Sequence, residues 1–193
     1  MQAETDMSYS YTAWREPFGV AETPAEYVIH RPRLYLETTI PSYLTARTSR
    51  DLTKARHQHI TAQWWNSWRT QFDIYVSEHV LTEVGDGDPD AARRRLDLIA
   101  PYVVLIPDGR SKKLAKLLME NCGLPTNAEA DAEHVAVAAV HSMDFLLTWN
   151  CAHLANEQFA PKIALICKAE GYICPALCTP NQLIERYEHG LHG

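Results

Sequence analysis

Residues 126–150 constrain the fold more than any other stretch, because a capped helix is followed there by a buried strand. Thr126 is a favoured N-cap residue, and Glu129 three positions later completes a capping-box pattern. The run 145–149 is apolar apart from one Thr, as is typical of a strand covered on both faces. Before that strand, five apolar residues repeat at helical spacing: Ala132, Val135, Ala136, Ala139 and Val140. An α/β fold is the expectation.

Two polar residues of this stretch form a candidate site. Asp131 lies beside the apolar stripe, one turn before Val135, which predicts a charged group at the edge of the core near the sheet. Asn150 follows the strand directly, at its carboxyl end. Ligands of open α/β sheets bind beyond the carboxyl ends of the strands. A helix-borne aspartate and a strand-end asparagine beside one crevice are therefore candidates for binding or catalysis.

The remaining chain alternates short strands with helices. Strands are expected at 34–36, 73–77, 102–106, 145–149 and 172–176. A turn at 40–44 leads into a short helical piece, and a long helix is expected from Asp51, its N-cap, to about residue 70. Further helices are expected at 78–84, 90–99, 111–121, 161–170 and 180–187. This alternation predicts a parallel sheet flanked by helices.

An aromatic stripe marks the long helix that begins after Asp51. Four large residues recur at every fourth position, with Trp65 beside them: Ile60, Trp64, Trp68 and Phe72. Such a stripe could stack on nucleic-acid bases, but buried helix packing is much the commoner use of this pattern. We interpret it as core, with any exposed part of the Trp64–Trp68 helix available for a dimer.

Length and composition narrow the class of protein. The 193 residues predict one domain at 32–187, a weakly ordered extension at 1–31 and a tail at 188–193. No run is apolar enough to span a membrane, and the first residues lack a signal core. Five cysteines, an odd number, favour a reduced cytoplasmic protein over a disulfide framework or a structural zinc site. The net charge of −6 argues against a general nucleic-acid binder, and the run of arginines at 93–95 is best interpreted as a solvated helix face.

Acidic residues stand at equivalent places after successive strands. Glu37 ends the first strand, Glu83 lies on the helix after the second, and Asp131 and Asn150 belong to the stretch described first. Phosphate-binding glycine loops and the G-x-S-x-G motif are absent from the sequence. Each acid alone is more often a surface group, and other acids near Glu83 compete for its role. Together, oxygen ligands without thiols suit Mg²⁺ or Mn²⁺.

With these residues in place, the chain from about residue 32 to 186 resembles a PIN domain, in particular the VapC-like toxins of type II toxin–antitoxin systems. The matching segments are 34–39, Glu83, 131–136 and 147–156, of which the last is the most specific. The resemblance implies a three-layer α/β/α sandwich with a short parallel sheet of four or five strands. It also implies a metal-dependent endoribonuclease that cleaves RNA, a cognate antitoxin and a homodimer.

The resemblance further implies roles for individual residues. Three acids would hold the metal: Glu37, Glu83 and Asp131. Asn150 would orient the water shell of the metal, and Thr38 or Thr39 would hydrogen-bond the attacking water or a ligand. His153 could contact phosphate or donate a proton, although a loop-capping role is favoured. For His134 we expect only a packed or hydrogen-bonded side chain.

Two positions depart from the family pattern. The first acid is usually Asp but is Glu37 here, and the fourth, often Asp, is the neutral Asn150. One firmly held metal is therefore expected, with a second arriving only with substrate. The neutral residue also leaves an alternative open, a catalytically weak PIN-like module that binds RNA or protein. A Mg²⁺-dependent phosphatase is disfavoured because no strand ends in Asp-x-Asp.

Overall fold

The computed structural model describes residues 31–150 and 159–190. The predicted extension at 1–31 falls outside these ranges apart from Arg31, and the tail at 188–193 falls partly outside them. His153 also lies outside the described residues. Among the residues that are described, no helix combines the length and the apolar character needed to cross a bilayer.

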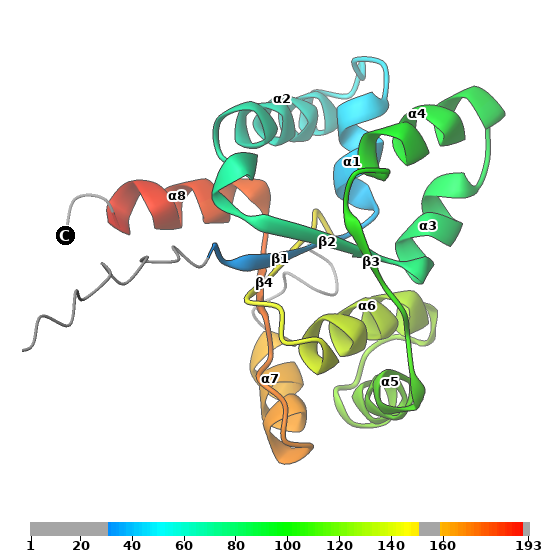
Figure 1. Ribbon diagram of the computed structural model, residues 1–193, viewed down its shortest axis with the longest axis vertical. Helices are drawn as coiled ribbons and strands as arrows, with labels where there is room; N and C mark the ends of the chain where they lie inside the picture. Colours follow the sequence, from blue (N-terminus) through cyan, green and yellow to red (C-terminus); the bar gives the residue numbers. More distant parts are fainter. Residues whose placement is uncertain (1–30, 151–158, 191–193) are drawn as a thin grey trace, which may run out of the picture. The chain divides into compact units, whose positions relative to one another are not determined.

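Five parallel strands form the sheet of the described chain (Figure 1). The strands are β1 (Arg33–Leu36), β2 (Asp73–Ser77), β3 (Val103–Leu105), β4 (Phe145–Leu147) and β5 (Ala176–Cys178). Their spatial order is β3-β2-β1-β4-β5, so the chain builds outward from β1 on one side and then returns to the other. The order reverses between β1 and β4, which is where ligands of such sheets bind.

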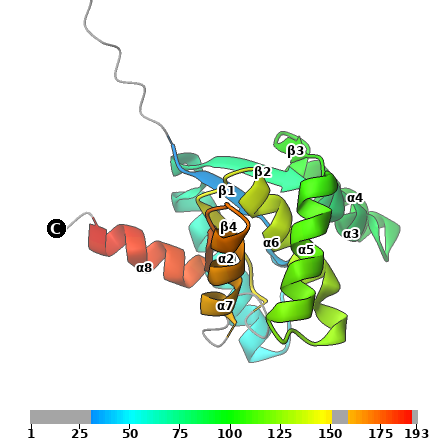
Figure 2. The same cartoon turned by 90° about the horizontal axis from the view of Figure 1, so that it is seen from below.

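Helices cover both faces of this sheet and make three layers (Figure 1). On one face lie α5 (Gly109–Asn121), α6 (Glu129–Val140) and α7 (Ala160–Ala169), which Figure 2 shows one beside another. The other face carries α1 (Thr39–Thr45), α2 (Leu52–Ser67), α4 (Pro89–Ile99) and α8 (Pro180–Gly190). The short α3 (Glu78–Gly85) leaves β2 at the carboxyl edge. The predicted three-layer sandwich with a short parallel sheet is confirmed.

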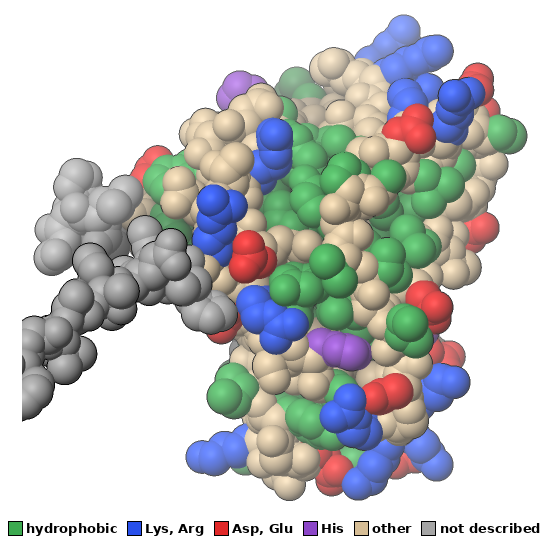
Figure 3. All heavy atoms as spheres, viewed as in Figure 1, with side chains coloured by type: hydrophobic (Ala, Val, Ile, Leu, Met, Phe, Trp, Pro, Cys, Tyr) green, Lys and Arg blue, Asp and Glu red, His purple; other side chains and the backbone are tan. Residues whose placement is uncertain are grey.

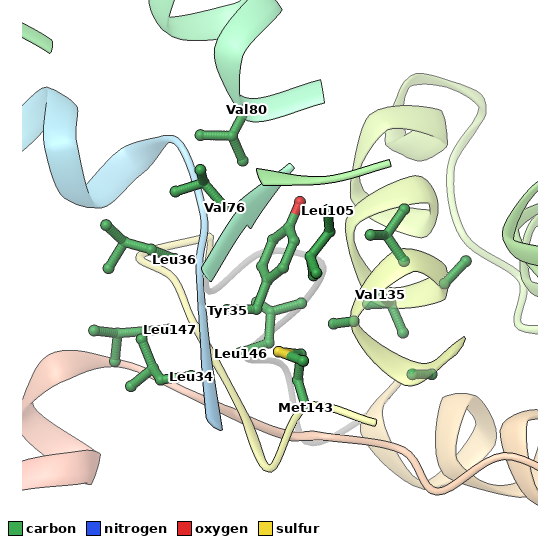
Figure 4. Packing of buried hydrophobic residues seen from close by; sticks show 14 of the residues in the cluster. Leu34, Tyr35, Leu36, Val76, Val80, Leu105, Val135, Met143, Leu146 and Leu147 are labelled. Atoms are coloured by element: carbon green, nitrogen blue, oxygen red, sulfur yellow. The ribbon is translucent and has the colours of Figure 1, made fainter. Parts of the chain in front are cut away.

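The core occupies both sides of the central strand β1. Leu34 and Leu36 point to one side, together with Leu147, whereas Tyr35 and Leu146 point towards α6 (Figure 4). All five side chains are fully buried. This alternation is the period of two that a strand imposes on its side chains. It also carries the hydroxyl group of Tyr35 to the layer of α6.

The central helix α6 begins later than predicted. Thr126 does not cap it; residues Thr126–Ala128 form a 3₁₀ turn, and the N-cap is Ala128, without a side-chain hydrogen bond. The carbonyl of Pro125 accepts from the N–H of Ala128 at 2.9 Å. The chain therefore already turns at Thr126, and the capping-box interpretation was wrong.

The aromatic stripe of α2 is core, as predicted. Asp51 caps the helix by accepting from the N–H of Lys54 at 2.9 Å. Trp64 is fully buried, Trp65 and Trp68 are half-buried against the core, and Phe72 is buried beyond the helix end. A dimer surface built on Trp64 is excluded by this burial. On α2 the exposed large apolar side chain is Leu52, at the start of the helix, and others occur on β3 and just after it: Val103, Val104 and Ile106.

The last strand was misplaced. It was expected at 172–176, whereas β5 spans Ala176–Cys178. Pro175 has no N–H to donate to a neighbouring strand. Pairing therefore starts with the N–H of Ala176, which donates to the carbonyl of Asp144 at 2.9 Å. The third and fourth strands are also shorter than predicted.

The arginine run on α4 is a solvated face, as the sequence suggested. Lys and Arg side chains gather at the upper right of Figure 3, over α4. Arg93 and Arg94 are exposed, and Arg93 lies 3.8 Å from Asp97 one turn on. Arg95 instead donates to the carbonyls of Val84 and Asp86 at 2.8 and 2.6 Å. It therefore ties α4 to the end of α3.

Candidate metal centre

Glu37 stands at the point where the strand order reverses. It follows β1 directly, and its backbone N–H donates to the carbonyl of Leu147 at the end of β4 at 3.1 Å. Its Oε2 accepts from the Thr39 N–H at 3.0 Å, from the Thr39 hydroxyl at 2.5 Å and from the Thr148 hydroxyl at 2.8 Å. Burial raises the pKa of Glu37, and the charge of His134 and these hydrogen bonds offset only part of that effect. The carboxyl group is held firmly but is costly to ionise.

Glu83 reaches the same place from α3. The hydroxyl of Ser77 caps this helix by accepting from the N–H of Val80, which sets the helix at the end of β2. Oε2 of Glu83 accepts from the Thr38 hydroxyl and lies 3.1 Å from Nε2 of His134. Burial alone would raise the pKa of Glu83, but the hydrogen bonds and charge of its neighbours lower it overall. The side chain is one-third exposed, so the centre opens to solvent here.

His134 joins the two glutamates and was not predicted as a site residue. Its side chain is 2% exposed, and its Nδ1 lies 2.7 Å from the hydroxyl of Tyr35. That hydroxyl lies 2.6 Å from Oγ of Ser77. Burial lowers the pKa of His134, but the hydrogen bond to Glu83 and the nearby carboxylates raise it overall. Without a metal, these neighbours therefore favour the imidazolium form of His134.

These three side chains can converge on one ion. One donor atom each of Glu37, Glu83 and His134 lies within 4.8 Å of the other two. Ligands bound to one ion at about 2.1 Å are at most about 4.2 Å apart, so small side-chain rotations suffice. Tyr35 behind His134 corresponds to the outer partner that orients most metal-binding histidines. Two carboxylates and an imidazole fit Mn²⁺ better than Mg²⁺. We call Glu37, Glu83 and His134 the candidate metal centre.

Asp131 and Asn150 form a pair beside this centre. Nδ2 of Asn150 donates to Oδ1 of Asp131 at 2.7 Å, and the Asn150 N–H donates to the Thr148 hydroxyl at 2.9 Å. Asp131 is nearly buried in the first turn of α6, and its charge helps to raise the pKa of His134. Asp131 is not part of the three-donor group found among the described residues.

Of the three predicted metal ligands, Glu37 and Glu83 come together with His134, whereas Asp131 lies beside them in a pair with Asn150. Thr38 binds Glu83, and Thr39 binds Glu37, so the two threonines hold the glutamates. The expectation that His134 is a packed, hydrogen-bonded side chain is confirmed, but its place among the possible metal donors was missed. Its spacing of three from Asp131 places both on one helix face, which was the available signal.

Comparison with solved structures supports the architecture. One similar chain comes from the "crystal structure of VapBC2 from Rickettsia felis bound to a DNA fragment from their promoter". The match has a TM-score of 0.50 at 14% identity, and it covers 76% of this chain and 97% of that one. The fold is PIN-like. No protein-family model and no curated protein matches the sequence.

Proposed function

We propose that the protein is a Mg²⁺- or Mn²⁺-dependent endoribonuclease that hydrolyses RNA phosphodiester bonds. The observation that carries this proposal is the candidate metal centre, placed at the strand-order reversal of a PIN-like sheet. Carboxylates buried so closely are costly without a cation. The resemblance of the sequence segments to PIN domains points in the same direction.

The metal would supply a water of lowered pKa and would neutralise charge on the phosphoryl oxygens. Glu37, fixed by Thr39 and Thr148, and Glu83, fixed by Thr38, provide the negative charge that retains it. Tyr35 keeps the ring of His134 aimed at the centre. Because Asn150 is neutral, we propose one firmly held cation, with a second bound only with substrate.

Asp131 and Asn150 act next to the centre in this proposal. The amide of Asn150 holds Oδ1 of Asp131, which fixes the direction of that carboxylate. So placed, Asp131 either completes the ligand set or orients the attacking water. His153 is proposed as a loop residue of the same edge, from the sequence resemblance alone.

We further propose that the protein acts in the cytoplasm as the toxin of a type II pair and that a cognate antitoxin restrains it. The similar solved chain comes from a VapBC2 structure with promoter DNA, which motivates an antitoxin partner for this chain too. A homodimer is also proposed, for which the exposed apolar residues of β3 are available.

A second candidate function is a catalytically weak PIN-like module that binds RNA or protein. Asn150 favours it, because an amide at this position removes a charge from the cluster and is already engaged with Asp131. Such a module would bind RNA without cleaving it, whether or not Mn²⁺ is present.

Metal binding and RNA cleavage by matched variants test the proposal. Calorimetric titration with Mn²⁺ should give one strong site in the wild type, and Glu37→Gln should abolish that site and the cleavage of RNA. Asp97→Asn removes one carboxylate whose side chain is 74% exposed on α4, and it should leave both intact. Failure of the folded wild type to bind Mn²⁺ at millimolar concentration would refute the nuclease. Two tight sites without RNA would refute the single-metal proposal.

A further inference from the structure

A cavity of about 550 Å³ lies between α2 and the start of α8. Its volume falls within the range of sites for small molecules, about 300–1,000 Å³. Ile60 and His57 of α2 line it, together with Trp149 and, at the start of α8, Asn181. We call it the α2–α8 cavity. It shares no lining residue with the candidate metal centre.

Trp149 connects this cavity to the centre. Its backbone N–H donates to the Thr39 hydroxyl at 2.9 Å, and that hydroxyl donates to Glu37 at 2.5 Å. Its indole Nε1 donates to the hydroxyl of Thr61 at 2.7 Å. Trp149 is therefore held through both its backbone and its indole ring, and its backbone lies two hydrogen bonds from Glu37. The position of Trp149 is thus tied to that of Glu37.

Two aromatic rings, those of His57 and Trp149, line the cavity, and Tyr43 packs behind them. His57 stacks on Trp149 with ring centroids 3.9 Å apart and planes 13° apart, and Tyr43 meets both rings edge-on. Burial and the charge of Arg56 lower the pKa of His57, which favours the neutral imidazole. Its Nδ1 is shielded from solvent and has no hydrogen-bond partner among the described residues. Flat, uncharged rings of this kind are the surfaces on which unpaired bases stack.

The segment that supplies the α2 side of the cavity is rich in positive charge although the whole chain is acidic. Residues 46–60 contain four cationic side chains and one acid, Asp51, in a chain of net charge −6. All four are exposed, and none forms an ion pair within 4.0 Å in the part of the chain that the structure describes: Arg47, Arg50, Lys54 and Arg56. Arg56 lines the cavity itself. Unpaired cations beside two aromatic rings match a nucleic-acid strand, whose phosphates and bases alternate.

We infer that the α2–α8 cavity is a nucleobase subsite, which takes one unpaired base of an RNA strand against Trp149, His57 and Ile60 while Arg56 binds an adjoining phosphate. This inference rests on the proposed nuclease function for its choice of RNA. It adds the form of the substrate, because a paired base cannot leave its partner to enter the cavity without unstacking. Single-stranded segments and loops are therefore selected over duplex RNA.

Binding measured in EDTA tests the subsite without cleavage. The probe is a fluorescein-labelled single-stranded RNA 12-mer of mixed sequence, followed by anisotropy. His57→Ala should weaken binding about 5- to 160-fold, the range for loss of one stacked base. His59→Ala, an exposed histidine two residues along the same helix, should leave the affinity within twofold. Thermal unfolding of each variant verifies that the fold persists.

Two further measurements distinguish base from phosphate recognition. Arg56→Gln should reduce the slope of log affinity against log salt by about 0.7, whereas Arg94→Gln on α4 should not change it. An abasic residue scanned along the 12-mer should weaken wild-type binding at one position more than at others. In His57→Ala the abasic residue at that position should weaken binding no more than at the others, because the side chain on which the base stacks has already been removed.

The outcomes separate this inference from the proposed nuclease. RNA binding that is unaffected by His57→Ala and Arg56→Gln, or weakened equally at every abasic position, would overturn the subsite even if Mn²⁺-dependent cleavage is observed. Binding with the predicted variant pattern but without any cleavage would support the subsite and refute the nuclease. No RNA binding at low salt would overturn the subsite and leave the cavity to a ligand of another class.

Discussion

Replacing Tyr35 with Phe removes one buried hydroxyl group and leaves the ring in place. That hydroxyl lies 2.7 Å from Nδ1 of His134 and 2.6 Å from Oγ of Ser77, and Tyr35 is fully buried. Ser77 keeps a partner, because its Oγ also accepts from the N–H of Val80. Nδ1 of His134 loses the only hydrogen bond recorded for it among the described residues. A buried polar atom left unsatisfied costs about 1–3 kcal/mol.

We therefore expect Tyr35→Phe to lower the free energy of unfolding by about 2 kcal/mol, close to the middle of that range. For a domain of this size, that loss lowers the unfolding temperature by about 4–8 °C. The same substitution releases the ring of His134, so Mn²⁺ affinity should fall by about 10- to 100-fold, as for other outer-shell partners of metal ligands. Urea unfolding in EDTA and calorimetric titration with Mn²⁺ measure the two effects.

Tyr75→Phe is the matched control. Tyr75 lies directly opposite Tyr35 in the parallel pairing of β1 with β2. Its ring packs under the guanidinium of Arg33 at 4.9 Å, a contact that Phe keeps, and no hydrogen bond of its hydroxyl is found within the described residues. Loss of the Tyr75 hydroxyl should therefore lower the free energy of unfolding by less than about 0.5 kcal/mol. Equal stability and equal Mn²⁺ affinity for the two variants would refute the role assigned to Tyr35.

Three further predictions concern the stability of the fold. Because the pKa of His134 is raised in the fold, protonation of His134 stabilises the metal-free protein fully below the ordinary pKa of 6.5, and this contribution is lost as the pH rises through the folded-state pKa. In EDTA, the free energy of unfolding in urea should therefore decline above pH 6.5, and His134→Gln should flatten this decline. Equal pH dependence of the two proteins would contradict the prediction. Leu146 is fully buried on β4, so Leu146→Ala should lower the free energy of unfolding by about 2–5 kcal/mol. Leu165 on α7 is 68% exposed, so Leu165→Ala should lower it by less than about 0.5 kcal/mol. Gly171 has φ +83°, so Gly171→Ala should cost about 1 kcal/mol. Gly109 belongs to α5 and has open space for an added Cβ. In the same unfolding assay, Gly109→Ala should therefore leave the free energy of unfolding unchanged or raise it by up to about 1 kcal/mol. A larger loss of stability in Gly109→Ala than in Gly171→Ala would contradict this reasoning.

Local patterns predicted those elements whose own residues determine them. Asp51 was expected to cap a long helix and does so, because its carboxylate reaches a backbone N–H three residues away. The second strand was predicted at 73–77, where β2 is found. The gathering of acids at one edge was also predictable, since the carboxyl ends of parallel strands meet there.

Features that depend on partners from elsewhere in the chain were missed. Thr126 has the right spacing to Glu129 for a capping box, but the 3₁₀ turn after Pro125 takes its place. The start of β5 depends on Asp144, whose carbonyl receives the N–H of Ala176. The role of His134 required knowing that Tyr35, from a strand about 100 residues earlier, lies behind its ring. The spacing of His134 from Asp131 places it on the right helix face, but the contact with Tyr35 is not part of any local pattern.

His134 and Asn150, the basic and the neutral residue among the acids at the carboxyl edge of the sheet, are best understood together. Three acids, Glu37, Glu83 and Asp131, are buried or half-buried around His134, whose raised pKa favours a compensating positive charge without a metal. An aspartate in place of Asn150 would bring a fourth carboxylate to the position from which the amide now donates to Asp131 at 2.7 Å. Two carboxylates at that distance cannot both be ionised without strong repulsion. A neutral donor at 150 and a basic ligand at 134 therefore allow the edge to fold before a cation arrives, and they leave the centre with a donor set suited to one ion.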